Sequence, residues 1–346
     1  MVLGRSLRFR MEGKVMTLSE TQWTLQNRQA EETRQLRKNA WFVGLSLLAI
    51  FATQVVAGLC LGGLLNRAEA QMDISDAARL YYYALYCGYY CLMLLVPTAV
   101  MALIFRRSPR SHAERPRLTG GSGVLLIAFG LAFCVLANYL VNYWLQFVSL
   151  FGVEPYEGDY HNAAGWLPLA LNLFTYAILP GLVEETVFRG WILGALRPFG
   201  ERRALLLSAL IFGLMHGNLT QVPFAFLLGM LFGFLYLRTG RLWIGMVIHA
   251  LNNALSVVLD YVSENMGLTE NTYILVQLSV FAVLVIIGCT AAFILRHRDD
   301  ALTYPLRDHR HVVPTAKRAR MMWLSPAIVA ALVLMLALTV MQEMVL

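Results

Sequence analysis

Charged residues are scarce in this chain. Asp, Glu, Lys and Arg make up 14% of its 346 residues, whereas about a quarter of the residues in a soluble domain are charged. Hydrophobic residues make up 58%. This composition excludes an ordinary soluble domain and predicts a polytopic membrane protein, whose apolar side chains face lipid and other helices. The expected fold class is all-α, a transmembrane helical bundle with a polar cavity within the membrane.

Cysteine is also rare. The chain has five cysteines, an odd number, and no Cys-x-x-Cys pair. This pattern excludes a disulfide framework and a thiolate metal site. All five lie within apolar runs, where we expect them to act as small packing residues.

Three further absences narrow the class of protein. Residues 1–39 hold no apolar core, so we expect no cleavable signal peptide. The net charge is +7, but aromatic and basic residues do not alternate along any polar face, which argues against nucleic-acid binding. No internal repeat is visible, so an inverted-repeat transporter is not supported.

Nine apolar runs follow the polar N-terminal arm, and most are long enough for the roughly 20 residues that a bilayer requires. Two runs are short, and we expect them to be tilted, partly re-entrant or buried against neighbours. The nine runs lie at residues 40–65, 81–105, 122–150, 166–196, 203–217, 222–238, 242–262, 272–295 and 322–345, the short ones being 203–217 and 222–238.

The segments between the runs alternate in charge. Of the 28 Lys and Arg, 25 lie in five segments, namely the arm and residues 106–117, 197–203, 238–241 and 296–320. The intervening loops are mostly acidic, so the positive-inside rule places the N-terminus in the cytoplasm and predicts eight or nine crossings. The expected organisation is a cytosolic arm (1–39), a transmembrane bundle (40–296), a basic cytosolic loop (297–321) and a C-terminal transmembrane helix (322–346).

Small and aromatic residues suggest how these helices pack. Gly58-x-x-x-Gly62 and Gly229-x-x-x-Gly233 predict faces for close helix contact. Pro180 predicts a kink that re-aims the residues after it and frees a backbone carbonyl. A group of tyrosines at the start of the second run predicts an aromatic belt at the membrane surface: Tyr81, Tyr82, Tyr83 and Tyr86.

Two adjacent carboxylates and an arginine interrupt the fourth apolar run. Glu184, Glu185 and Arg189 lie where an ionised side chain costs at least a few kcal/mol. Glu185 and Arg189 are four residues apart on a helix and can form an ion pair, which lowers this cost. Glu184 is turned about 100° away from that pair and is left as a candidate general base.

Two of the seven histidines also lie inside apolar runs, at His216 and His249, with Asn253 one helical turn after His249. Counted from the nearest cytosolic arginines, Glu184 and His216 lie about 20 Å deep and Asn253 about 18 Å deep. These groups can therefore meet near the middle of the bilayer. Glu184 and His216 could activate a water, while His249 and Asn253 could donate to an oxyanion, which together would make a peptide or amide hydrolase.

A metal site is the alternative chemistry for the same residues. Two imidazoles and a carboxylate form a common catalytic zinc set, and Glu184, His216 and His249 would supply it. There is no His-Glu-x-x-His motif to favour zinc. Spacing across three helices leaves a metal open, and the interpretation preferred through the resemblance described next has no cofactor.

The three motifs together resemble the CPBP family, the CAAX protease and bacteriocin-processing (Abi) family of intramembrane proteases. They are Glu-Glu-x-x-x-Arg at 184–189, Phe-x-x-x-His at 212–216 and His-x-x-x-Asn at 249–253. The family includes the endopeptidase of prenylated CAAX proteins. The resemblance implies that Glu184 and His216 activate water and that His249 and Asn253 form the oxyanion hole.

In the same resemblance Glu185, Arg189 and Phe212 have supporting roles. It implies a peptide or a membrane-anchored protein as substrate, including a prenylated one, and the lipid bilayer as a partner. The basic arm and the last apolar run exceed the eight-helix core common in the family. A proton-coupled transporter and a non-catalytic scaffold that regulates a membrane partner are the alternative functions.

Overall fold

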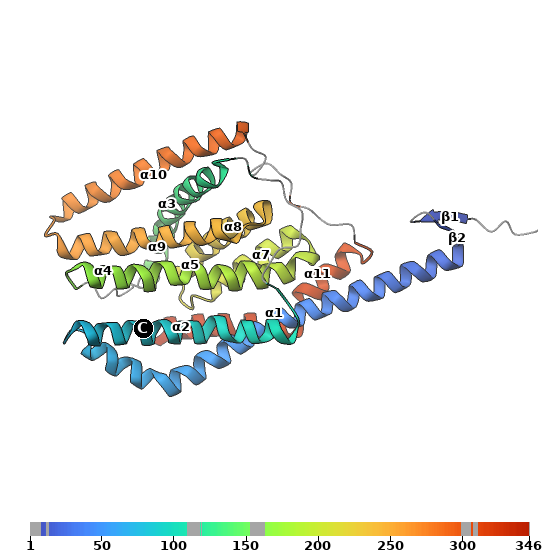
Figure 1. Ribbon diagram of the computed structural model, residues 1–346, viewed down its shortest axis with the longest axis horizontal. Helices are drawn as coiled ribbons and strands as arrows, with labels where there is room; N and C mark the ends of the chain where they lie inside the picture. Colours follow the sequence, from blue (N-terminus) through green and yellow to red (C-terminus); the bar gives the residue numbers. More distant parts are fainter. Residues whose placement is uncertain are drawn as a thin grey trace, which may run out of the picture.

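The computed structural model describes residues 8–11, 14–108, 118, 120–152, 163–298, 306 and 311–345. Residues 109–117 and 153–162, which belong to two predicted loops, lie outside the described residues. Much of the predicted basic loop 297–321 lies outside them as well. The described chain is an all-α bundle, as predicted (Figure 1). One short antiparallel hairpin, β1 (Arg8–Met11) and β2 (Lys14–Thr17), lies at the start of the arm, outside the bundle.

The bundle is built from long helices (Figure 1). Its first half contains α1 (Leu18–Gln71), α2 (Asp76–Ile104) and α3 (Ser122–Ser149). A composite helix then runs through α4 (Trp166–Asn172), η1 (Leu173–Ile178), α5 (Leu179–Glu184), η2 (Glu185–Leu193), α6 (Gly194–Leu196) and η3 (Arg197–Phe199). The remainder is α7 (Glu201–Leu214), α8 (Gln221–Thr239), α9 (Leu242–Asn265), α10 (Glu270–Arg298), α11 (Thr315–Trp323) and α12 (Pro326–Val345).

Seven of the described helices are long and apolar enough to cross a membrane, or up to eight if the bent pair α11 and α12 counts as one span. The chain is therefore a multi-pass integral membrane protein. The crossing predicted at 203–217 is not among these spans, because α7 has only 14 residues and is about 21 Å long. Nine crossings are thus too many.

The α7–α8 hairpin turns back inside the protein. Its tip contains Asn218 and Thr220, which are 3% and 5% exposed. The Asn218 side-chain oxygen accepts the Gln221 N–H at 2.7 Å and so caps α8. Both ends of this hairpin return to one side, so the arginine-rich segments before α7 and after α8 stay together. The charge alternation of the other spans is therefore the same whether the hairpin counts as no crossing or as two.

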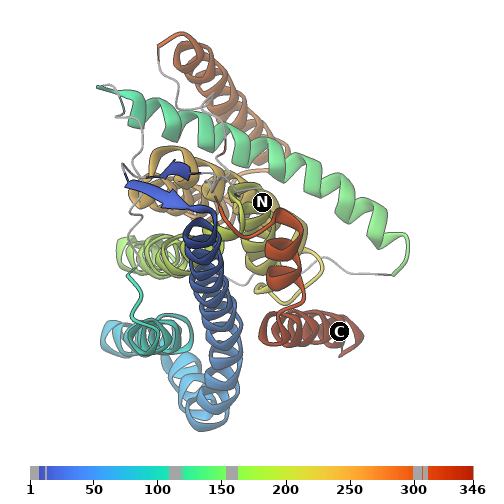
Figure 2. The same cartoon turned by 90° about the vertical axis from the view of Figure 1, so that its right-hand side faces the viewer.

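Helix α1 passes through the predicted boundary at residue 39 without interruption. Its first half extends beyond the bundle, and its second half packs against α2 and α12 (Figure 1). Gly44 permits the close contact with α12, since a Cβ there would lie 2.4 Å from Ala327. In the perpendicular view, α3 crosses the other helices diagonally with α10 beside it (Figure 2).

Only one of the two predicted glycine faces packs closely. A Cβ at Gly229 would lie 3.0 Å from Ala209, and one at Gly233 2.6 Å from Leu205, so α8 meets α7 through this face. The other prediction is wrong. A Cβ at Gly62 would meet nothing within 4 Å, and one at Gly58 only the Tyr89 hydroxyl at 3.8 Å.

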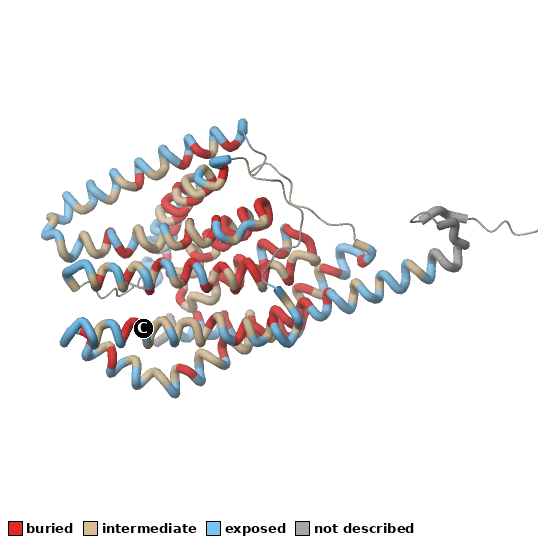
Figure 3. Tube along the Cα trace, in the orientation of Figure 1, coloured by how far each residue is buried: buried red, intermediate tan, exposed pale blue. Residues whose placement is uncertain are grey.

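The predicted aromatic belt is also partly wrong. Tyr81 is half exposed, but Tyr82 and Tyr83 are 4% and 2% exposed. The Tyr83 hydroxyl donates to the side-chain oxygen of the fully buried Asn172. These tyrosines therefore join α2 to the composite helix instead of facing the lipid surface. The most deeply buried residues gather in the helices from α5 to α9, and α10 is largely exposed (Figure 3).

Candidate active site

The composite helix that carries the two glutamates is irregular on both sides of them. The segments η1 and η2 are π-helical, a rare conformation that occurs frequently at functional sites. Pro180 has no N–H and interrupts the helical hydrogen bonds just before the glutamates. The Asn253 side-chain amide, on α9, donates to the Tyr176 carbonyl of this segment at 3.1 Å. This bond joins α9 to the composite helix.

Glu185 and Arg189 form the buried ion pair that their spacing predicted. Arg189 Nη1 lies 2.9 Å from Glu185 Oε1, and both side chains are 1% exposed. The guanidinium carbon also lies 4.2 Å from the centre of the Phe212 ring and 5.2 Å from that of Phe232. This cation–π enclosure adds to the ion pair that stabilises the arginine in an apolar environment.

His249 is held by this ion pair on one side and by an aromatic ring on the other. Its Nδ1 lies 3.1 Å from Glu185 Oε1, and its ring stacks on Phe232 with centroids 5.4 Å apart. Because an ionised carboxylate can only accept, Nδ1 must carry the proton and donate. The other ring nitrogen, Nε2, therefore faces Glu184, whose Oε2 is 3.9 Å away.

Glu184 has one engaged oxygen and one open oxygen. The Tyr90 hydroxyl, on α2, donates to Oε1 at 2.5 Å. Oε2 is buried and has no hydrogen-bond partner among the described residues. A buried carboxylate oxygen without a partner is costly, so a water or a substrate group would stabilise it.

His216 approaches the same place from the end of α7. Its Nδ1 lies 2.9 Å from the Phe212 carbonyl oxygen, which can only accept, so Nδ1 donates and Nε2 is left as an acceptor. His216 and Glu184 line one cavity of about 110 Å³, which is large enough for several waters. The other residues around this cavity are Gln54, Tyr90, Met93, Leu94, Phe188 and Met215.

The structure thus brings together most of the predicted site. Glu184 and His216 face one cavity, and His249 lies directly behind Glu184 without lining that cavity. Phe212 packs edge-on against both imidazole rings, at 5.2 Å from His216 and 6.1 Å from His249. Asn253 does not line the cavity, and its amide is bound to the Tyr176 carbonyl. The oxyanion-hole roles of His249 and Asn253 stay predictions.

The donor groups give the zinc alternative no support. Across the described ranges, no three His, Cys, Asp or Glu side chains are grouped so that they could hold a metal ion. Peptide cleavage with and without a chelator tests metal dependence.

Two polar residues of the cavity are absent from the sequence prediction. Tyr90 was one of many tyrosines in α2, and nothing in its spacing singled it out. Gln54 is a single amide in the apolar run of α1. This isolation could have identified it as a site residue, because a polar group at membrane depth needs a partner. It has no hydrogen bond among the described residues, so its amide is available to a ligand in the cavity.

The fold and the site together define a class: a multi-pass membrane protein with a buried Glu–His centre beside a small cavity. The family described as "Rce1-like: Type II CAAX prenyl endopeptidase Rce1-like" matches residues 166–255. This segment holds the composite helix, α7, α8 and the first part of α9. Over these residues the chain is similar to CAAX-type membrane proteases, in agreement with the resemblance seen in the three motifs.

Curated relatives agree with this assignment. The chain is 33% identical over 91 residues to the "Putative membrane peptidase YdiL" of Bacillus subtilis (strain 168), a match that covers 26% of this chain and 37% of the relative. It is 33% identical over 97 residues to the "Membrane-embedded CAAX protease MroQ" of Staphylococcus aureus (strain USA300), covering 26% of this chain and 39% of the relative. The matches thus span less than half of either relative. No solved structure matches the chain significantly.

Proposed function

We propose that this protein is an intramembrane endopeptidase that hydrolyses a peptide bond with a water activated by Glu184 and His216. The observation that carries the proposal is the open Oε2 of Glu184, buried beside the cavity that His216 also lines. A carboxylate that can receive a proton and an imidazole nitrogen that can accept a hydrogen bond are what a water needs to become a nucleophile.

The proposed reaction starts with a water between Glu184 Oε2 and His216 Nε2. Glu184 takes one proton while the water oxygen attacks the scissile carbonyl carbon, and the carbonyl oxygen becomes an oxyanion. The proton on Glu184 then passes to the departing amine as the carbon–nitrogen bond breaks. The products are a carboxylic acid and an amine, and the glutamate returns to its ionised form.

His249 and Asn253 are the proposed oxyanion donors. With Nδ1 bound to Glu185, His249 can donate through Nε2 only when it carries both protons. Asn253 donates one amide hydrogen to the Tyr176 carbonyl and has a second amide hydrogen that could be donated to the oxyanion.

The proposed substrate is a peptide segment of a membrane-anchored protein, including a prenylated one. Apolar side chains contribute half of the cavity lining, namely Met93, Leu94, Phe188 and Met215. Such a lining favours an apolar side chain next to the scissile bond. The name of the Staphylococcus aureus relative, a CAAX protease, supports the same substrate class.

Purified protein in detergent, mixed with a quenched-peptide library, tests the proposal. The wild-type protein should cleave members of the library, while Glu184→Gln and His249→Ala should lower the rate by a factor of about 100 or more. A chelator should leave the wild-type rate unchanged if no metal takes part. The proposal fails if wild-type protein and both variants cleave equally, and a folded but inactive wild type would favour the scaffold or transporter alternatives.

A further inference from the structure

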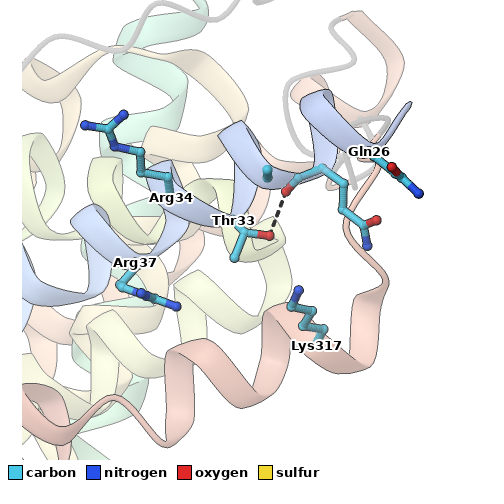
Figure 4. Close-up of a pocket in the computed structure, with 7 residues that line it drawn as sticks. Gln26, Thr33, Arg34, Arg37 and Lys317 are labelled. Atoms are coloured by element: carbon cyan, nitrogen blue, oxygen red, sulfur yellow. Dashed lines mark hydrogen bonds between the residues drawn. The ribbon is translucent and has the colours of Figure 1, made fainter. Parts of the chain in front are cut away.

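A second, larger cavity lies far from the Glu–His centre, where the first part of α1 meets α11. It has a volume of about 440 Å³ and is lined by Gln26, Gln29, Ala30, Thr33, Arg34, Arg37 and Lys317. Figure 4 shows Lys317 extending from α11 toward α1, with Arg37 and Thr33 on the facing helix. Three cations from two helices that are far apart in the sequence thus surround one space.

The two helices are fastened together beside this cavity. The Glu32 carboxylate accepts the backbone N–H groups of Val312 at 2.8 Å and of Val313 at 3.1 Å. His311 Nδ1 lies 2.6 Å from the other oxygen of the same carboxylate. This clamp holds the start of α11 against α1, and it keeps Lys317 opposite Arg34 and Arg37.

The charge of the cavity lining is unbalanced. No acidic residue lines it, and Arg34, Arg37 and Lys317 have no ion-pair partner in the described part of the chain. The neighbouring carboxylate of Glu32 is already bound to three N–H groups. Like charges held near one another repel, so a bound anion would stabilise the arrangement. The amides of Gln26 and Gln29 supply additional donors for its oxygens.

The cavity also lies at the level of lipid headgroups. Arg37 is three residues, or about 5 Å, before the apolar run that starts at residue 40. Lys317 precedes the apolar helix α12, which packs against α1 at Gly44, about two turns after Arg37. Trp41 and Trp323 lie close by in the sequence, as tryptophans do at a membrane surface.

We propose that this α1–α11 cavity binds a phosphate-bearing anion, and that the headgroup of an anionic phospholipid is its source. Arg34 and Arg37 would engage the phosphate oxygens from α1, and Lys317 would do so from α11. The bound lipid would then join the arm helix to the last two helices at the membrane surface. This proposal does not depend on peptidase activity.

Native mass spectrometry of the full-length protein in detergent tests the proposal. The protein is titrated with dioleoylphosphatidylglycerol, with dioleoylphosphatidylcholine and with inorganic phosphate in separate arms. Wild type is compared with the triple variant Arg34→Gln, Arg37→Gln, Lys317→Gln. The control is Arg202→Gln, Arg241→Gln, Arg296→Gln, which removes three exposed cations from the same predicted side but outside the cavity.

We expect wild type and the control variant to retain one phosphatidylglycerol in preference to phosphatidylcholine. Each basic residue near an anionic surface contributes about a factor of five in affinity, so the cavity variant should bind this lipid up to about 100-fold more weakly. Saturation of the cavity by inorganic phosphate alone would support the phosphate site but identify a soluble ligand as its source. Equal losses in both triple variants, or no preference in wild type, would overturn the proposal. Melting temperatures without lipid show whether each variant is folded.

Discussion

Two adjacent glutamates on one helix lie in different surroundings, and this difference gives them different chemistry. Glu185 is bound by Arg189 and by the His249 imidazole, so its position is fixed. Glu184 has a single hydroxyl donor and one open oxygen beside a cavity. We therefore expect Glu185 to stabilise the site and Glu184 to exchange protons.

Tyr90 should tune Glu184 without being required for folding. Replacement by Phe removes one hydrogen bond to a charged group, which contributes about 1.5–3 kcal/mol. We expect Tyr90→Phe to lower kcat by about 10- to 100-fold, because Oε1 then competes with Oε2 for the proton and for water. The measurement is peptide cleavage together with thermal unfolding.

Tyr89→Phe is the matched control, since the Tyr89 hydroxyl makes no hydrogen bond within the described residues. It should leave kcat unchanged. If both variants lose activity equally, the hydrogen bond to Glu184 has no special role.

Gln54 should act on substrate binding. Its amide lines the cavity with Glu184, and it has no protein partner in the described chain. A side-chain amide can pair with the N–H and C=O of an extended peptide. We expect Gln54→Ala to raise KM about 10-fold with little change in kcat, as measured by steady-state kinetics on a single peptide.

The neighbouring Thr53 gives the comparison, because its hydroxyl is already bound to the Ala49 carbonyl at 2.8 Å. Thr53→Ala should leave KM unchanged. A fall in kcat rather than a rise in KM for Gln54→Ala would contradict a role in binding.

At the scale of the element, the composite helix and α9 are coupled through one carbonyl. The Asn253 side-chain amide donates to the Tyr176 carbonyl, one turn before Pro180. The bond fixes α9, and with it His249, relative to the two glutamates. Asn253 therefore has a structural role in addition to its predicted catalytic one.

A double-mutant cycle separates these two roles of Asn253. Asn253→Ala removes the side-chain donor to the Tyr176 carbonyl, which should cost about 1–3 kcal/mol of folding free energy. Pro180→Ala adds an N–H four residues after Tyr176 that can bond this carbonyl, so the loss should be smaller in that background. Thermal unfolding and peptide cleavage are both measured for the four proteins.

Activity should not return together with stability. If Asn253 also donates to the oxyanion, the double variant stays at least 10-fold slower than Pro180→Ala. Recovery of both quantities would leave Asn253 with a structural role alone.

At the scale of the whole molecule, the spans form a bundle with one internal hairpin. The tip of the α7–α8 hairpin is buried and ordered by Asn218. His216 lies just before this tip, so the irregular backbone there is sheltered by protein, which is the setting in which membrane proteins tolerate it. The hairpin thus brings His216 to the cavity that Glu184 also lines.

Single cysteines in a variant without the five native ones test this arrangement. In intact cells, a membrane-impermeant maleimide should label Ile74→Cys, between α1 and α2, because the N-terminus is predicted to be cytoplasmic. Ser108→Cys should react only after lysis, and Leu219→Cys at the hairpin tip should be protected in both cases. Labelling of Leu219→Cys from outside would mean that α7 and α8 both cross the membrane. Labelling of Ser108→Cys in intact cells would invert the predicted orientation.

Much of this description could be predicted from local sequence. Apolar runs and the scarcity of charge specified a helical membrane protein, because a spanning backbone must satisfy its own hydrogen bonds. The cost of buried charge identified Glu184, Glu185, Arg189, His216 and His249 as members of one centre. Their depths, counted from the nearest arginines, were sufficient to bring them to one level.

Only the tertiary structure decided which partner each group has. The contacts of Tyr90 with Glu184 and of Asn253 with Tyr176 join helices that are 94 and 77 residues apart in the chain. Helix rotation and crossing angle determine such contacts, and neither is encoded in the spacing of residues along one helix. The same reason explains why one glycine face packs and the other does not, and why the cations of α1 meet Lys317 of α11.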